Sequence, residues 1–299
     1  MIFQYRAAKA MVSNQFGCLY VVATPIGNLG DMSPRAIEVL KSVNIIAAED
    51  TRHTGRLLAQ FDCRTPQVSL HEHNETARLA GLLDRLRGGE AVALVSDAGT
   101  PLISDPGYRL VLAARQAGVT VLTVPGPSSV TAALSVAGLP TDRFFFEGFL
   151  PARSPARKRR LEALCDIGCT LVFFESGRRL AATLSDMIAV FGGDREAAIS
   201  RELTKQFETT RRDDLAGLMD WQAADPNQTR GEFVVMVASA AAVVDAAELK
   251  QVSVDVGRLL SLLRQEGLSA KGAARIVAEL SGLSANQLYD QATRALKPN

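Results

Sequence analysis

Short apolar runs alternate with amphipathic segments along the first half of the chain. The predicted strands are runs rich in β-branched and other apolar residues, at 19–23, 43–48, 91–96 and 119–124. Each run has the length of a strand that is buried on both faces. Helical periodicity and capping residues between them predict helices at 35–42, 54–61, 74–88 and 107–118. Because strands and helices alternate, the pattern predicts βαβ crossovers and a largely parallel sheet.

The second half of the chain has a different pattern, with aromatic strands. Its predicted strands lie at 144–149, 170–174, 197–201 and 232–238, and its predicted helices at 156–165, 178–191 and 213–223. The pattern favours a second α/β domain with more antiparallel pairing.

A small helical tail follows, with helices predicted at 256–266, 269–281 and 284–296. The second and third begin after Gly-Leu-Ser, whose serine is a good N-cap. The tail is mildly basic and resembles a helix-turn-helix module. The expected parts of the chain are therefore an N-terminal arm at 1–17, two α/β domains at 18–139 and 140–245, and this tail at 246–299.

Composition narrows the classes of function. The 299 residues carry 33 Lys and Arg against 32 Asp and Glu, a net charge of +1, which excludes a histone-like binder of bulk nucleic acid. Apolar residues make up 47% of the chain, which excludes a disordered protein. No apolar run reaches the ~20 residues that span a bilayer, and the arm lacks the apolar core of a secretory signal. We therefore expect a cytoplasmic protein whose four cysteines are reduced.

Three Gly- and Pro-rich turns follow predicted strands, at 23–28, 96–107 and 125–129. In a parallel sheet the carboxyl ends of the strands meet at one edge, where ligands bind. Each turn alone suits an ordinary tight connection, whereas three together favour a pocket. Neither the P-loop motif nor the dinucleotide-binding GxGxxG spacing is present. The turns therefore predict a nucleoside-like ligand held mostly by backbone groups.

Two polar motifs, at 49–53 and 71–75, contain all three histidines of the chain. One interpretation is hydrogen-bonded loop packing and helix capping. A second is a zinc site at His71, Glu72 and His73, but histidines two residues apart are a weak zinc signal, and no metal is expected. The third is a polar rim that faces a substrate.

A basic cluster, which contains no acidic residue, precedes and opens the helix predicted at 156–165; its members are Arg153, Arg157, Lys158, Arg159 and Arg160. Charge runs are often simply the solvated face of a helix. The alternative is a phosphate-binding edge, since each neutralised phosphate adds salt-sensitive affinity.

Eight motifs then stand in order: LYVVATPIGNLGDMSPRAIEVL, AEDTRHT, HEHNE, VSDAGTPLISDPG, VPGPSS, FFESGRR, SRELTKQFE and GEFVVMV. From 19 to 237 the chain resembles the tetrapyrrole-methylase-type methyltransferases that use S-adenosylmethionine. Within them it is most similar to the ribosomal RNA small subunit (cytidine-2′-O-)methyltransferase family, and the helical tail also fits. The resemblance implies two α/β domains with S-adenosylmethionine in the cleft between them, and a homodimer.

The resemblance also implies the cofactor-binding residues. Gly27 and its neighbours would form one wall, and Ser129 and Val130 would contact the methionine or ribose part. The Asp-Ala-Gly-Thr-Pro turn would contribute Asp97, Thr100, Leu102 and Ile103. The adenine side would be closed by Phe174, Leu203 and Glu232. The Asp-Ala-Gly-Thr-Pro turn stands where relatives that act on small tetrapyrroles have Gly-Asp-Pro. This difference argues against a porphyrin-like substrate.

The implied activity is 2′-O-methylation of a cytidine ribose in small-subunit (16S) ribosomal RNA, with the basic cluster contacting that RNA. The hydroxyl proton must be removed, and we favour the motif that holds Glu49, Asp50 and His53 for this role. Four further candidates stay open: Glu72, His73, Glu202 and Lys205. Two alternative functions also stay open. One is a methyltransferase acting on a small molecule or protein, which the basic cluster disfavours. The other is a nucleic-acid-binding regulator that uses the tail, which would leave the cleft without a role.

Overall fold

The computed structural model describes residues 17–239, 256–281, 284, 288–289 and 292. Contacts divide the chain into two compact units, 1–240 and 241–299. The first unit contains two five-stranded sheets, and the helical tail belongs to the second unit. The expected boundary between two α/β domains at 139 and 140 stays a prediction.

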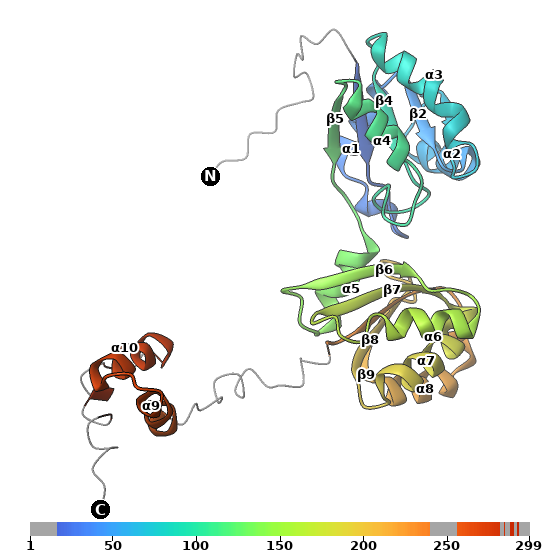
Figure 1. The fold of residues 1–299 in the computed structure, drawn as a ribbon. Helices are drawn as coiled ribbons and strands as arrows, with labels where there is room; N and C mark the ends of the chain where they lie inside the picture. The colour runs from blue at the N-terminus through green and yellow to red at the C-terminus, as the bar shows by residue number, and fades with distance from the viewer. Residues whose placement is uncertain (1–16, 240–255, 282–283, 285–287, 290–291, 293–299) are drawn as a thin grey trace, which may run out of the picture. The chain divides into compact units, whose positions relative to one another are not determined.

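The first sheet is parallel throughout, as the alternating pattern predicts. Its strand order is β3-β2-β4-β1-β5 (Figure 1). The strands are β1 (Cys18–Val22), β2 (Ile45–Ala48), β3 (Gln67–Ser69), β4 (Val92–Val95) and β5 (Thr120–Val124).

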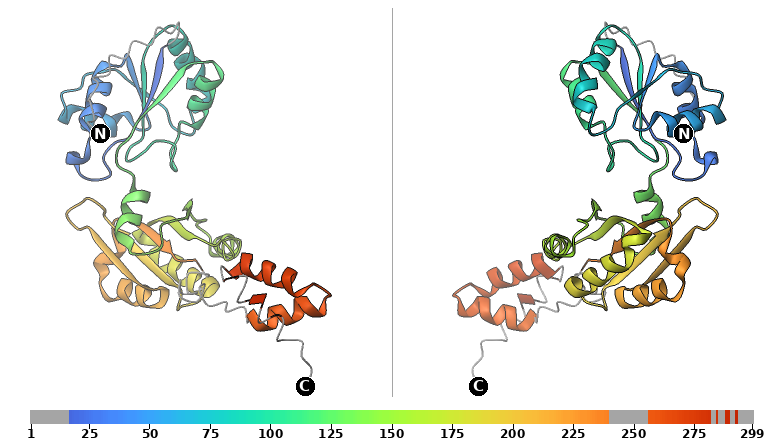
Figure 2. Two further views of the ribbon diagram at one scale, coloured as in Figure 1. Left: turned by 90° about the vertical axis from the view of Figure 1, so that its left-hand side faces the viewer. Right: turned by 90° about the vertical axis from the view of Figure 1, so that its right-hand side faces the viewer.

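Helices cover both faces of this sheet (Figure 2). A short 3-10 turn, η1 (Leu29–Asp31), precedes α1 (Pro34–Ser42), which lies with α2 (Thr51–Gln60) on one face. The other face carries α3 (Glu75–Arg87) and α4 (Tyr108–Gln116). Successive residues of a strand point to opposite faces, so Ile46 packs with the first pair of helices and Ile45 with the second.

The second sheet has the order β6-β7-β10-β8-β9. One pair, β6 with β7, is parallel and the other three are antiparallel, which confirms the more antiparallel character expected of this half. The strands are β6 (Phe144–Phe149), β7 (Thr170–Ser176), β8 (Glu196–Arg201), β9 (Thr209–Asp214) and β10 (Glu232–Val237).

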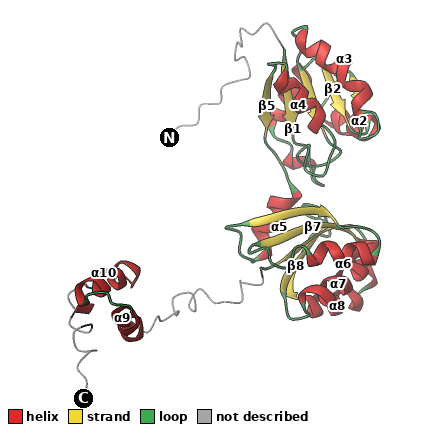
Figure 3. Ribbon diagram, in the orientation of Figure 1, coloured by secondary structure: helices red, strands yellow, loops and turns green. Residues whose placement is uncertain are grey.

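Four helices sandwich the second sheet (Figure 3). One face carries α6 (Ser154–Glu162), α7 (Gly177–Phe191) and α8 (Leu215–Ala224), which is followed by η2 (Pro226–Thr229). The opposite face is covered by α5 (Ser129–Ala137), whose buried core includes Val130 and Leu134. Because α5 follows β5 of the first sheet and packs on the second, it joins the two halves of the unit.

The sequence pattern does not predict three of the strands and α-helices in the described residues: β3, β9 and α5. The first has only three residues, and the second, TTRRDD, is an edge strand without apolar residues. The helix α5 is apolar nearly all round and begins inside the third Gly- and Pro-rich turn, so no amphipathic period marks it. In addition, α2 begins at Thr51 rather than at residue 54, because Asp50 caps it.

In the second unit, α9 (Val256–Gln265) and α10 (Ala270–Ser281) match the first two helices predicted for the tail. They pack through a small apolar cluster that includes Leu260, Ala273 and Val277. The predicted third helix at 284–296 and the arm at 1–17 lie largely outside the described residues. None of the helices in the described part of the chain is both long and apolar enough to cross a bilayer.

Candidate functional site

The three Gly- and Pro-rich turns meet at the carboxyl edge of the first sheet, as expected. Backbone hydrogen bonds join the first two, from Thr24 N to Gly99 O at 2.9 Å and from Gly99 N to Thr24 O at 3.0 Å. The Thr100 hydroxyl donates to the Pro127 carbonyl at 3.1 Å and so attaches the third. The turns therefore form one continuous surface.

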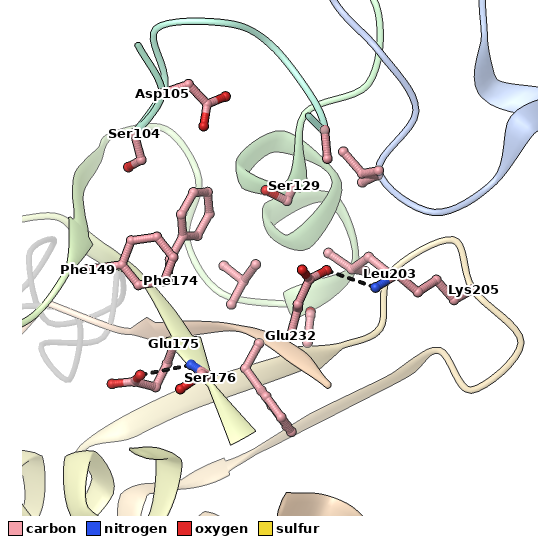
Figure 4. A pocket seen from close by; sticks show the side chains of 15 residues that line it. Ser104, Asp105, Ser129, Phe149, Phe174, Glu175, Ser176, Leu203, Lys205 and Glu232 are labelled. Atoms are coloured by element: carbon pink, nitrogen blue, oxygen red, sulfur yellow. Dashed lines mark hydrogen bonds and ion pairs between the residues drawn. The ribbon is translucent and has the colours of Figure 1, made fainter. Parts of the chain in front are cut away.

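A cavity of about 330 Å³ lies between this surface and the second sheet. Its size is within the usual range for small-ligand pockets, about 300–1,000 Å³. The turns contribute Ile26, Ala98, Ser104 and Asp105, and the N-terminus of α5 contributes Ser129. Phe149, Phe174, Leu203 and Glu232 from the other half line the same cavity, and Figure 4 shows them with Ser104, Asp105 and Ser129.

The second-sheet wall is aromatic at one end and polar at the other. The rings of Phe149 and Phe174 meet edge to face with their centroids 5.5 Å apart. Beside them, the buried carboxylate of Glu175 accepts hydrogen bonds from the Thr183 hydroxyl at 2.6 Å and the Ser176 N–H at 2.8 Å. This wall can stack against a planar ring while satisfying polar groups next to it.

Lys205 spans the entrance between the two halves. Its Nζ lies 3.1 Å from Glu202 Oε1 and 2.8 Å from Glu232 Oε2 (Figure 4 shows the second pair). Gly27 lies beneath it, since an added Cβ there would meet Lys205 Cγ at 2.5 Å. Burial lowers the pKa of Lys205, but the two carboxylates outweigh it and raise the pKa overall. The amine therefore stays protonated and is unsuited to accept a proton.

The favoured motif at 49–53 is linked to the second turn by reciprocal hydrogen bonds. Asp50 N donates to Asp97 Oδ1 at 3.0 Å, and Asp97 N donates to Glu49 Oε2 at 3.4 Å. Burial raises the pKa of Glu49, and the charges of Asp97 and Asp50 add to the rise.

Asp50 has the opposite environment. Its carboxylate accepts hydrogen bonds from the N–H groups of Arg52 and His53 and so caps α2. The hydrogen bonds from Arg52 lower its pKa to about 2. A carboxylate that is already engaged and so weakly basic suits the capping interpretation of this residue better than the catalytic one.

Asp105 was not among the sequence candidates. It lines the first cavity, and burial raises its pKa to about 6, with a further rise from the charges of Glu49 and Asp97. The loop that presents it is strained, because Leu102 (φ 75°) and Ser104 (φ 67°) adopt left-handed backbone that side chains disfavour. The sequence signal that could have found it is the second acidic residue within the same turn.

The cofactor-binding residues implied by the family resemblance are distributed around this region. Four of them line the first cavity: Ser129, Phe174, Leu203 and Glu232. Gly27 and Asp97 line the neighbouring cavity, and Thr100 fastens the turns together. The remaining three lie elsewhere: Val130 is buried on the face of α5 that packs on the second sheet, Leu102 packs against the core of the first sheet, and Ile103 is exposed.

That neighbouring cavity has a volume of about 540 Å³ and a polar rim. It shares Ile26, Ala98, Lys205 and Glu232 with the first. Its outer wall is α2, which presents His53. Over the described residues, no group of three or more His, Cys, Asp and Glu side chains is arranged to hold a metal ion.

The structure corrects the expectation for the basic cluster at Arg157. This side chain is 3% exposed, and its guanidinium pairs with Asp186 at 2.8 Å, so it is closed to a phosphate. Lys158 lies 3.5 Å from the same carboxylate, and Arg160 forms a two-pronged pair with Glu147. Within the described part of the chain, the side chains of Arg153 and Arg159 have no hydrogen-bond or ion-pair partner.

Comparison with sequence families gives two matches. The family described as "Tetrapyrrole (Corrin/Porphyrin) Methylases" matches residues 18–218. A second family, described as "RsmI C-terminal HTH domain", matches residues 250–297.

Among curated proteins, the chain is 52% identical over 277 residues to "Ribosomal RNA small subunit methyltransferase I" of Pseudomonas aeruginosa, covering 92% of this chain and 96% of that protein. The protein of the same name from Escherichia coli O157:H7 is 47% identical over 279 residues, covering 93% and 96%.

Among solved structures, the chain is similar to diphthine synthase, with a TM-score of 0.57, 18% identity and coverage of 74% of this chain and 89% of that one. Cobalt precorrin-4 methyltransferase gives a TM-score of 0.54 at 20% identity, covering 74% and 94%. These distant likenesses concern the fold alone.

Proposed function

The chain belongs to the tetrapyrrole methylase family, and from that premise we propose that it transfers a methyl group from S-adenosylmethionine to small-subunit ribosomal RNA. The acceptor in this proposal is the 2′-hydroxyl of a cytidine. The observation that carries the proposal is the cavity shared by the turns of the first sheet and the end of the second. Relatives that match over more than nine tenths of the chain and carry the ribosomal RNA name support the class of substrate.

The residues around this cavity fit the cofactor chemically. A planar adenine can stack on Phe174 and Phe149, next to the apolar side chains of Leu203 and Val234. A ribose and an amino-acid group need several hydrogen-bonding partners, which Ser129, Glu232 and the bare backbone of the turns supply. A positively charged sulfonium is favoured beside carboxylates, which gather at the same edge.

When bound, S-adenosylmethionine supplies an electrophilic methyl group and leaves as a neutral thioether. The hydroxyl oxygen forms the new C–O bond, and its proton passes to the carboxylate of Asp105. Asp105 suits this role because it faces the cavity and, with a pKa of about 6, is ionised yet still basic at neutral pH. Glu49 and Asp97 raise the basicity of Asp105 through their charge.

The other residues of the proposal position the reactants. Lys205 holds Glu232 at the entrance, and Asp50 fixes the start of α2, which presents His53 to the neighbouring cavity. Positioning matters most here, because the methyl donor is already activated and in-line approach is the main requirement.

Contact with a large RNA needs surface beyond the cavity. Arg153 and Arg159, with Lys158 and Arg160 at their sides, belong to the proposed RNA contact, and Arg157 does not. The match of 250–297 to a helix-turn-helix domain supports a role of the tail in RNA binding. A homodimer and a cytoplasmic location complete the proposal, both implied by the family.

The test is transfer of labelled methyl groups from S-adenosylmethionine to isolated small subunits and to naked small-subunit RNA. We expect label in RNA in at least one of the two. Confirmed cofactor binding without label in either RNA would overturn the proposal and would point to a small-molecule or protein substrate instead.

A further inference from the structure

One face of helix α2 lines the cavity that neighbours the cofactor site. The residues on this face are His53, Arg56, Leu57 and Gln60. Their spacing of three, four and seven residues from His53 places them on one side of an α-helix. The opposite side is buried against the first sheet through Thr54 and Leu58. The helix therefore has one face that packs on the sheet and another face that lines the cavity.

The polar side chains on this face have no partner within the described residues. Over the residues that the structure describes, the side chains of His53, Arg56 and Gln60 make no hydrogen bond or ion pair. Arg52, on the same helix, differs because it pairs with Asp50 at 3.2 Å. The second cavity is therefore lined by a guanidinium, an imidazole and an amide that can each form hydrogen bonds with a ligand.

The position of the cavity limits what can occupy it. It shares Ile26, Ala98, Lys205 and Glu232 with the proposed cofactor cavity, so a ligand on the α2 face adjoins whatever fills the other side. Its volume of about 540 Å³ lies in the range of pockets that hold one small ligand. An RNA duplex does not fit there, whereas a single nucleotide does.

We propose that this face of α2 binds the target nucleotide of the RNA, taken out of its stack, with Arg56 on a flanking phosphate and Gln60 on the edge of the base. The inference rests on the proposed function and names the site that delivers the ribose to the cofactor. Enzymes that modify a nucleotide commonly extrude it into such a pocket.

The side chains on this face match the parts of a pyrimidine nucleotide. Arg56 offers the forked donors that suit a phosphate, and Arg56 and Gln60 lie one turn apart, about 6 Å along the axis. The amide of Gln60 both donates and accepts, as the edge of cytosine requires. Between them, Leu57 and His53 provide an apolar contact and a ring on which a base can stack.

The decisive variants are Arg56→Ala and Gln60→Ala, with Arg64→Ala as the matched control. Arg64 is an exposed arginine just beyond α2 that lies outside the second cavity. Three quantities are measured for each variant: affinity for small-subunit RNA at several salt concentrations, affinity for S-adenosylmethionine by calorimetry, and the thermal midpoint. The target RNA is also prepared with uridine in place of the methylated cytidine.

We expect Arg56→Ala to weaken RNA binding about tenfold and to reduce the salt slope by about one, with cofactor affinity unchanged. We expect Gln60→Ala to weaken binding of the cytidine and uridine RNAs alike, about fivefold, because an amide without an intramolecular partner can turn to suit either base edge. Arg64→Ala should stay within twofold of the wild type in both affinities and should leave the thermal midpoint unchanged.

Two results would overturn the inference. One is Arg56→Ala binding RNA as the wild type does. The other is Arg56→Ala losing cofactor affinity, which would assign this arginine to the cofactor. Either result leaves methyl transfer by the wild type intact, so it is distinguishable from failure of the proposed function.

Discussion

Two aspartates near the cofactor cavity have opposite environments. Asp50 is held by hydrogen bonds from Arg52, which lower its pKa to about 2. Asp105 is half-buried near Glu49 and Asp97, which raises its pKa to about 6. The sequence directs attention to Asp50 because it stands in a polar motif with a histidine. The structure favours Asp105, because only the fold places it in the cavity.

The first prediction concerns the replacement Asp105→Asn. The wild-type group accepts a proton only when ionised, so kcat should rise with pH through about 6 and then level off. The amide cannot ionise, so the variant should lose that inflection and about 100-fold or more in kcat. The pH profile of single-turnover methyl transfer checks this.

Asp84→Asn is the matched control, since Asp84 is an exposed carboxylate of α3 that pairs with Arg87. Cofactor affinity measured by calorimetry should be unchanged in Asp84→Asn, and in Asp105→Asn, which removes a carboxylate from the cofactor cavity, it should fall far less than kcat does. An Asp105→Asn enzyme that keeps the wild-type inflection near pH 6 would show that another group takes the proton.

At the scale of elements, helical geometry decides which charges are available. In the sequence, the basic cluster is a nearly continuous run of cations. In the structure, Arg157 lies on the buried face of α6, together with Leu161 one helical turn later. Asp186 on α7 receives it, along with the Ser154 hydroxyl at 2.9 Å. Arg159 lies on another side of the same helix and stays exposed.

The second prediction contrasts these two arginines. Arg157→Ala should lower the free energy of unfolding by about 3 kcal/mol, because the buried carboxylate of Asp186 loses its closest partner and keeps only the Ser154 hydroxyl and Lys158 at 3.5 Å. Arg159→Ala should change stability by less than about 0.5 kcal/mol. Its effect should instead be weaker RNA binding with a salt slope reduced by about one. Urea unfolding measures the stability of the two variants, and RNA binding at several salt concentrations measures their contacts with phosphates. Equal stability of the two variants would contradict a structural role of Arg157.

The elements that sequence pattern could predict are those with strong local signals. The buried strands of the first sheet are short apolar runs, and α1 has both a capping Ser33 and Pro34 at its first position. The strand β9 gives no such signal, because an edge strand can be wholly polar. The helix α5 gives no amphipathic period either, because it is apolar nearly all round and begins inside the third Gly- and Pro-rich turn.

At the scale of the whole molecule, the near-zero net charge of +1 hides an uneven distribution. Carboxylates gather around the cofactor cavity, while unpaired cations stand on α2 and α6. The gathering of three turns at one sheet edge was predictable, since parallel strands align their carboxyl ends. The second cavity could not be predicted from the sequence, because it is formed by α2 and Lys205, which come from opposite halves of the first unit.

The most direct measurement is the identity of the modified nucleoside. Small-subunit RNA methylated by the purified protein with labelled S-adenosylmethionine is digested to nucleosides and separated by mass spectrometry. We expect the label in 2′-O-methylcytidine at one position of the RNA. Label in a base-methylated nucleoside, or in the ribose of a different base, would contradict it.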